Sequence, residues 1–182
     1  MDLYDAIEER RTIRVYKKAA TEDQLRKIML AGTKAPSAGN RQQWEFILVD
    51  DPKIIVQLAE IKFQLNRTFT PDEGETQKEV EASALFQKKS FDHASIVAVC
   101  VNAGQSADGW LCIQNLSLAA VAEGLGTGIV SYWDKPQKQV ERLLGLPEAY
   151  ELVCVLKIGV PGVPGKAPER RPEFSWLHRN KF

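Results

Sequence analysis

Glycine and proline crowd the chain after Ile158, and this segment limits the possible folds more than any other. Proline has no amide hydrogen to donate and disrupts helices, while glycine weakens a strand interior. The sequence therefore predicts neither a helix nor a central strand after Ile158, and it predicts an extended arm over residues 159–182. The residues responsible are Gly159, Pro161, Gly162, Pro164, Gly165, Pro168 and Pro172.

The end of this arm is rich in large apolar side chains. Phe174, Trp176, Leu177 and Phe182 fall within its last nine residues. Exposed apolar surface tends to mark a contact site. We therefore expect the arm to pack against something, and a partner subunit is a natural candidate.

The overall composition is that of one globular domain covering residues 1–182. The chain has 24 Lys and Arg against 24 Asp and Glu, so its formal net charge is zero. This balance argues against nucleic-acid binding, which requires a clustered basic surface. No apolar run approaches the roughly 18 residues of a membrane span, and no apolar core follows the acidic start MDLYDAIEE. We expect a cytoplasmic protein that contacts no membrane.

Cysteine and histidine give no sign of a metal site or a disulfide framework. Cys100, Cys112 and Cys154 lie in apolar stretches without any Cys-x-x-Cys pair, and His93 and His178 are far apart in the sequence. Zinc sites and disulfide frameworks need tighter groups. The pattern favours three buried structural thiols over a Cys–His nucleophile.

Hydrophobic periodicity and capping residues predict an alternation of helices and strands. Residues 66–90 are polar, and we expect an exposed excursion with a short helix there, with a lid as one possible use. The predicted helices cover Leu3–Glu9, the segment after Thr21, the segment from Asp51 and Pro52, the apolar stretch Trp110–Glu123 closed by Gly124, and the segment from Pro136 to Gly145. The predicted strands are Trp44–Val49, Ser95–Val101, Gly128–Val130 and Leu152–Ile158.

Arg10, Thr12 and Arg14 form the first candidate site. Alternate residues of an extended segment point to the same side, so two guanidinium groups and a hydroxyl would face one ligand. This set suits a phosphate or another oxyanion. The alternative is a solvated basic turn balanced by Glu8 and Glu9.

Three further segments could approach a ligand. The loop Ala35–Trp44 carries the amides Asn40 and Gln42, although it could be a simple turn. The segment Glu123–Gly128 holds three glycines in five residues, which allow close backbone approach, although a helix cap explains Gly124 alone. Arg170 and Arg171 lie on the arm and could equally be a solvated pair.

Taken together and in this order, these motifs resemble the nitroreductase family of flavin enzymes. The resemblance spans nearly the whole chain except about residues 60–92, where such proteins vary most. Gln43 replaces a common proline, and Thr12 replaces the commoner serine. The matching segments are Arg10–Arg14, Ala35–Phe46, Gln114–Leu116, Gly124–Thr127, Ile158–Pro161 and Arg170–Pro172.

The resemblance implies an α+β fold with three layers, in which helices lie on both sides of a mixed central sheet. It also implies an intertwined homodimer, in which the arm of residues 159–182 adds a strand to the partner's sheet. The cofactor would be FMN, bound at the dimer interface in two copies per dimer. Residues 60–92 would then form a reduced, lid-like excursion.

The resemblance also implies roles for individual residues. Arg10, Thr12 and Arg14 would hold the FMN phosphate, the ribityl chain and the N1–C2=O edge of the flavin, with Arg11 beside them. Arg170 would bind the phosphate, with Arg171 as its substitute. The other residues that the resemblance assigns to the cofactor are Pro36, Ser37, Asn40 and Gln42 from the loop of the other subunit, Gly126 and Thr127 from the glycine segment, and Asn66 near the pyrimidine edge.

The activity that the resemblance implies is hydride transfer from NAD(P)H, through FMN, to a small acceptor such as a nitroaromatic or quinone, in a ping-pong sequence. The cofactor would carry the chemistry, so no catalytic side chain is assigned. Three alternatives remain open. They are another flavin reaction on the same fold (dehalogenation, dehydrogenation or flavin fragmentation), a non-catalytic FMN-binding protein, and an anion-binding domain without flavin.

Overall fold

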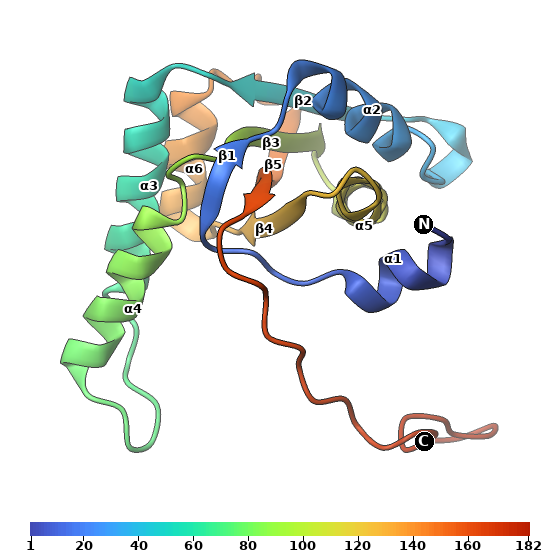
Figure 1. Ribbon diagram of the computed structural model, residues 1–182. Coiled ribbons are helices and arrows are strands. Elements are labelled where there is room, and N and C mark those ends of the chain that lie inside the picture. The colour runs from blue at the N-terminus through green and yellow to red at the C-terminus, as the bar shows by residue number, and fades with distance from the viewer.

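The computed structural model describes residues 1–182 and shows a five-stranded sheet between two groups of helices (Figure 1). The α+β fold with three layers is therefore confirmed. In chain order the elements are α1 (Leu3–Glu9), β1 (Tyr16–Ala19), α2 (Glu22–Gly32), the 3-10 turn η1 (Ala38–Asn40), β2 (Trp44–Val49), α3 (Pro52–Asn66), α4 (Gln77–Lys89), β3 (Ser95–Asn102), α5 (Ser106–Ala122), β4 (Gly126–Val130), α6 (Asp134–Leu143) and β5 (Tyr150–Pro161).

The layers follow from the alternation of side chains along the strands. In β3, Val97 and Val99 join a core with α2 and α5, while Ile96 and Ala98 join a second core with α3 and α6. All four are completely buried. A strand that is covered on both faces reads as a continuous apolar run, which explains why VAVCV is so clear in the sequence.

Strand β5 is the centre of the sheet. It pairs with β3 and β4, and its C-terminal end also pairs with β1. Every pairing between named strands is antiparallel, so the mixed character expected of the sheet is limited within this chain to an isolated parallel bridge between Thr12 and Thr127.

The prediction that strand structure ends at Ile158 is wrong. Strand β5 continues through Gly159 to Pro161, where Gly159 pairs with Ala19 and Pro161 with Tyr16. The proline is tolerated because it ends the strand. A side chain on Gly159 would lie 2.7 Å from the carbonyl oxygen of Lys18, so glycine permits the close approach of β1. Strand β1 was not predicted, because two of its four residues are lysines and Tyr16 alone is buried.

The helix-capping predictions agree with the structure. Thr21 forms a capping box with Gln24, Asp51 caps α3 with Pro52 in its first turn, and Gly124 follows α5 with φ +73°. Three boundaries differ: α5 begins at Ser106, α6 begins at Asp134, and α4 is a full 13-residue helix. The exposed excursion thus contains more regular structure than its polar composition suggested.

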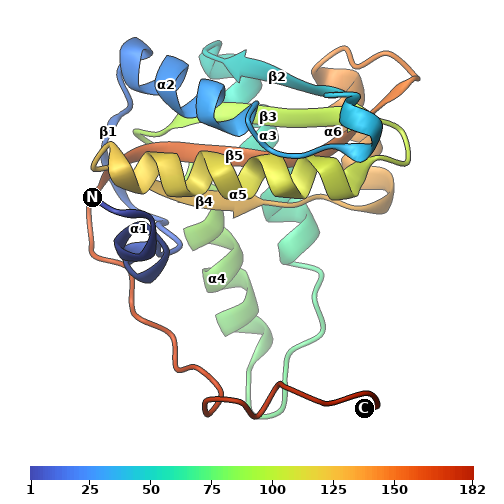
Figure 2. The same cartoon turned by 90° about the vertical axis from the view of Figure 1, so that its right-hand side faces the viewer.

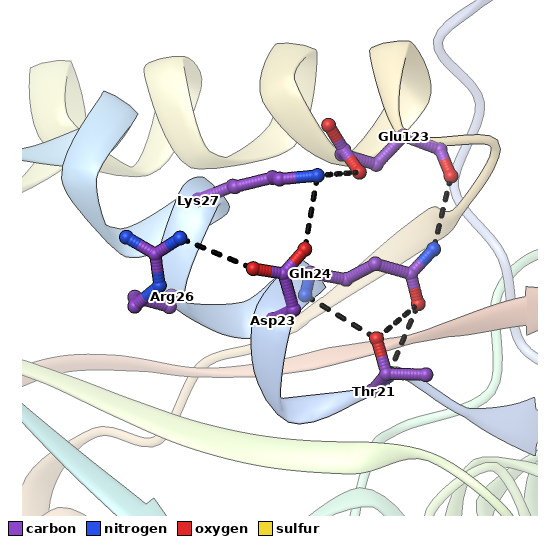
Figure 3. A network of polar contacts seen from close by, with 6 residues as sticks. All are labelled: Thr21, Asp23, Gln24, Arg26, Lys27 and Glu123. Atoms are coloured by element: carbon purple, nitrogen blue, oxygen red, sulfur yellow. Dashed lines mark hydrogen bonds and ion pairs between the residues drawn. The ribbon is translucent and has the colours of Figure 1, made fainter.

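Polar contacts join the start of α2 to the end of α5 (Figure 3). The Gln24 side-chain amide donates to the carbonyl oxygen of Glu123 at 3.2 Å. Lys27 lies 3.6 Å from the Glu123 carboxylate and 3.0 Å from Asp23. Exposed ion pairs contribute little individually. Their consequence is local, because they fix the chain just before it enters β4.

The segment after Pro161 leaves the body of the molecule (Figures 1 and 2). It contains no helix or strand, and Phe174, Trp176 and Leu177 are each more than half exposed. The arm therefore does not bury its aromatic end against its own chain. Its packing on a partner subunit stays a prediction.

The three cysteines are free and buried, as predicted. Burial raises the pKa of the Cys100 and Cys112 thiols to about 12. Thiols with such a pKa are poor nucleophiles, which agrees with a structural role.

None of the helices is long and apolar enough to cross a bilayer.

Candidate functional site

Both ends of the chain meet at a hollow of about 410 Å³ beside α1, α5 and β4. Arg10 and Thr12 come from the segment that follows α1, Thr127 comes from β4, and Arg170 comes from the arm. These four residues were predicted to share a site, and the structure brings them together. The remaining lining residues are Ile7, Gln114, Ser117 and Ile129.

The chain leaves α1 in an extended conformation at Arg10 and runs beside β4 at Thr12. The Arg10 backbone leaves the helix with ψ 122°, and Thr12 bridges to Thr127. The Ile13 amide donates to the carbonyl oxygen of Thr127 at 2.8 Å, and the Ile13 side chain is buried. The backbone is therefore anchored to β4 while Thr12 and Arg10 face the hollow.

The glycines of β4 make this anchoring possible. A Cβ atom on Gly126 would lie 2.2 Å from Cγ1 of Ile13, and one on Gly128 would lie 2.4 Å from the Ile13 carbonyl oxygen. Close packing of the chain on itself thus accounts for both glycines. Gly126 borders a neighbouring hollow together with Arg11, whereas Thr127 faces the first one.

The hollow is suited to an oxyanion. Two guanidinium groups reach it, and the hydroxyls of Thr12 and Thr127 lie around it, while no Asp or Glu is among its lining residues. The Ser117 hydroxyl also lines it but donates to the Ile113 carbonyl oxygen. Positive charge that no carboxylate neutralises, combined with hydroxyl donors, is the donor set that binds phosphate. The solvated-turn alternative stays open, because Thr12 and Arg14 are exposed, although neither Glu8 nor Glu9 forms an ion pair with Arg10.

Three predicted basic residues lie outside this hollow. The Arg11 guanidinium donates to the carbonyl oxygens of Glu8 and Arg10, and it faces the neighbouring hollow. Arg14 is exposed beyond Ile13, and Arg171 is exposed on the arm. None of the three is among the residues that line the 410 Å³ hollow.

The loop of Pro36, Ser37, Asn40 and Gln42 lies at the other end of α5 from α1 (Figure 2). The Asp108 carboxylate, near the start of α5, accepts the Ala38 amide at 3.2 Å. The Ser37 hydroxyl accepts the Gln42 amide at 2.9 Å. These bonds hold the loop in one shape, but it does not reach the hollow of its own chain.

The same loop has an uncommon backbone. Gly39, Asn40 and Gln42 have φ values of +59°, +55° and +53°. Such angles are easy for glycine, tolerated by asparagine and unfavourable for glutamine. Unfavourable backbone angles held in place by side-chain hydrogen bonds are common at functional sites.

Asn66 occupies a different hollow, of about 540 Å³, between the end of α3 and α4. Its Oδ1 atom is buried and accepts no hydrogen bond. The structure thus separates Asn66 from the Arg10 hollow. Phe69 borders the Asn66 hollow and stacks on Trp133 with ring centroids 5.7 Å apart.

Two side chains that line the hollow had no predicted role: Gln114, which lies in a segment that carries the resemblance, and Ser117, which no motif marked. They lie one turn apart on α5, on a helix whose other residues are mostly apolar. A polar pair at this spacing on an otherwise apolar helix is the signal that could have found them. Lys62 lies outside the hollow: its Nζ donates to the Ser131 carbonyl oxygen at 2.9 Å and lies 4.7 Å from the Trp133 ring centroid.

Known proteins are similar to this chain over most of its length. A model described as the nitroreductase family matches residues 7–160. Iodotyrosine deiodinase of Thermotoga neapolitana is 29% identical over 170 residues, with 89% of this chain and 90% of that protein covered. A 5,6-dimethylbenzimidazole synthase of Rhodobacter capsulatus is 33% identical, with 82% of this chain and 76% of the synthase covered.

Solved structures share the fold. An oxidised iodotyrosine deiodinase bound to FMN and 3-iodo-L-tyrosine superposes with a TM-score of 0.79, at 23% identity, with all of both chains covered. The NADPH:FMN oxidoreductase of Vibrio harveyi, complexed with NAD⁺, gives a TM-score of 0.78 at 22% identity, with 99% of this chain and 77% of the other covered.

Proposed function

The chain belongs to the nitroreductase family, and from this premise we propose that it is an FMN-dependent oxidoreductase that uses NAD(P)H. The observation that carries the proposal is the hollow in which Arg10, Thr12 and Arg170 converge from the two ends of the chain. The acceptor that we propose is a small electron-poor molecule such as a nitroaromatic or a quinone.

The residues of the hollow fit the phosphate of FMN. This group carries nearly two negative charges at neutral pH. Arg10 and Arg170 supply the opposite charge, while the hydroxyls of Thr12 and Thr127 add neutral donors. Because no carboxylate lines the hollow, no negative charge opposes an anion there.

Strand β4 gives the direction in which the cofactor would extend. Thr127 and Ile129 point to the same side and both line the hollow, and the chain then continues through Ser131 to Trp133. The six steps from Thr127 to Trp133 would span about 20 Å in extended chain, which is sufficient for a nucleotide-sized ligand. Bound FMN would supply hydride acceptance and release, so the chain itself needs to bind, orient and shield rather than act as an acid or base.

A homodimer would complete this site. The Ala35–Trp44 loop contacts α5 near Asp108, whereas the hollow contacts it at Gln114 and Ser117, about 9 Å or more along the helix axis. Trp110 and Leu111 lie on the same helix and remain 42% and 47% exposed. A second copy that covers these side chains would bring its own Pro36, Ser37, Asn40 and Gln42 to the cofactor.

The proposal is tested by the visible spectrum of the purified protein before and after anaerobic addition of NADH or NADPH. We expect a bound flavin spectrum that bleaches on addition of either donor and returns with a quinone or nitroaromatic. A flavin spectrum that neither donor bleaches would identify a non-catalytic FMN-binding protein. A colourless protein that takes up no added FMN would instead leave an anion-binding domain.

A matched pair of variants tests the phosphate site itself. Arg170 lines the hollow and Arg171 does not, although both are exposed arginines on the arm. Losing one charge-assisted contact to the phosphate should weaken FMN binding by about 10- to 100-fold in Arg170→Ala. Arg171→Ala should bind FMN like the wild type in a fluorescence-quenching titration. Equal losses in both variants would contradict the placement of the phosphate.

Reductive dehalogenation is a second candidate. It is favoured by the deiodinase relative, whose match covers nine-tenths of its own length. Incubation of the reduced protein with 3-iodo-L-tyrosine, followed by iodide measurement, separates the candidates. Stoichiometric iodide release with slow quinone reduction would favour the dehalogenase.

A further inference from the structure

Lys157 is the largest completely enclosed polar side chain of the molecule, with a relative exposure of 1%. It lies in β5 within the apolar run LVCVLKIGV. None of the ion pairs in the structure includes it. A buried lysine without a carboxylate partner is rare, since burial of an unpaired charge is costly.

The surroundings of Lys157 provide one hydrogen-bond partner. Its Nζ donates to the Ser90 hydroxyl, which in turn donates its own proton to the Gln87 carbonyl oxygen at 2.6 Å. The Phe91 ring centroid lies 5.3 Å from Nζ. The amine is therefore held in place as a donor, with no negative group beside it.

The lysine stem passes over the strand that borders the candidate cofactor site. Gly128 of β4 is the direct partner of Lys157, and a Cβ atom on Gly128 would lie 3.1 Å from Cε of Lys157. The neighbours of Gly128 along β4, Thr127 and Ile129, line the 410 Å³ hollow. Lys157 thus lies one strand from the site and on the other face of the sheet.

The charged groups that affect the pKa of Lys157 are both positive. They are Arg14, from the segment after Ile13, and Lys62, from α3; the Tyr16 hydroxyl of β1 faces the Lys157 carbonyl oxygen. Burial first, and then these two charges, lower the pKa of Lys157 to about 7. Arg14 is also the residue expected at the N1–C2=O edge of the flavin. A new negative charge near Lys157 would favour its protonated form, since no carboxylate lies beside the amine.

We propose that Lys157 is a buried positioning residue that takes up a proton when the flavin is reduced, and that its charge then stabilises the negative charge of the reduced cofactor. The inference rests on the proposed FMN-dependent function. Two electrons and one proton reach the flavin, and a second proton moves from solvent to Nζ of Lys157. The total is two protons for two electrons, and one negative and one positive charge form together.

The midpoint potential of the bound flavin, measured against pH between about 7 and 9, tests this coupling. In the wild type we expect the potential to fall with the slope of two protons per two electrons. In Lys157→Met, which keeps the length of the side chain but cannot bind a proton, we expect half that slope. Lys53→Met, which removes an exposed lysine of α3, should behave like the wild type.

The possible results separate the inference from the function. A wild-type slope of one proton per two electrons overturns the inference, and so does an equal slope in the wild type and Lys157→Met. If Lys157→Met does not retain FMN, Lys157→Gln replaces it, because its amide can still donate to Ser90. A protein that holds no FMN in any form would contradict the proposed function instead, and a slope difference without NAD(P)H turnover would support the inference while contradicting the choice of electron donor.

Discussion

Lys157 also makes the stability of the cofactor-free protein depend on pH. Its pKa is about 7 in the folded chain and about 10.4 in an unfolded one, so between these values the unfolded state binds more protons. The contribution of Lys157 to the free energy of unfolding must therefore increase as the pH rises through this window. The difference in the free energy of unfolding, wild type minus Lys157→Met, should increase from pH 7 to pH 9 in urea titrations.

Subtracting the free energy of unfolding of Lys157→Met from that of the wild type cancels the contributions of the other titrating groups. Burial also lowers the pKa of Lys62, to about 8, and raises that of the cysteine thiols, but these groups are the same in both proteins. Lys53→Met minus wild type should stay flat across the same range. A flat wild type minus Lys157→Met difference would show that the amine stays charged in the folded state.

Gln42 provides a second test at the scale of one residue. Its φ of +53° is unfavourable for any residue with a Cβ atom, by about 1–2 kcal/mol. Gln42→Gly should relieve that cost and yet weaken FMN binding, because it removes the predicted amide contact. Arg41→Gly, at φ −72°, has nothing to relieve and should lower the free energy of unfolding by about 0.4–1 kcal/mol.

Urea titration and FMN titration of the two variants give the comparison. Gln42→Gly should be more stable than Arg41→Gly by about 1–2 kcal/mol, the cost of the left-handed backbone. If Gln42→Gly binds FMN as well as the wild type does, the glutamine side chain has no part in the site. If Gln42→Gly is more stable than Arg41→Gly but binds FMN like the wild type, the glutamine affects only the backbone conformation of the loop.

The predictability of the site from sequence also varies residue by residue. Arg10, Thr12 and Thr127 could be placed together because a motif marks each of them. Lys157 could not, since its burial depends on Gly128 and Ser90, which are 29 and 67 residues away in the sequence. Local patterns reveal a charge in an apolar run, but only the packed sheet shows that no carboxylate reaches it.

At the scale of elements, the most predictable ones have local signals. Helices α2 and α3 carry caps, and β3 carries a continuous apolar run. Strand β1 and the last residues of β5 form only because the two segments pair with each other across about 140 residues of sequence. The prediction that no strand would include Pro161 was wrong, because a proline is excluded from the interior of a central strand but is tolerated at the end of one.

Helix α5 shows how one element connects the core to an assembly. Its residues Cys112, Ile113 and Leu116 fill the core. A helix that is apolar almost all round is typical of full burial, but Trp110 and Leu111 remain 42% and 47% exposed within one chain. The excess of apolar surface is explained if a second copy covers it, together with the exposed Leu3, Tyr4 and Ile7 of α1.

At the scale of the whole molecule, a dimer would link the arm, the loop and the hollow into one functional unit. A chain of 20.4 kDa should then sediment at twice that mass. A charge at Trp110 would be buried in the interface without a partner, so Trp110→Lys should shift the protein towards monomer. Since the loop of one subunit is expected to complete the site of the other, the same variant should lose FMN affinity even though Trp110 does not line the hollow.

Val56→Lys is the matched control, because Val56 is similarly apolar and 62% exposed but lies on α3, on the opposite side of the sheet from α5. It should remain dimeric and retain FMN. Analytical ultracentrifugation and FMN titration on the same samples give both readouts. A monomeric Trp110→Lys that binds FMN with wild-type affinity would show that each chain holds its cofactor alone, and the loop would then need another explanation for its unfavourable backbone.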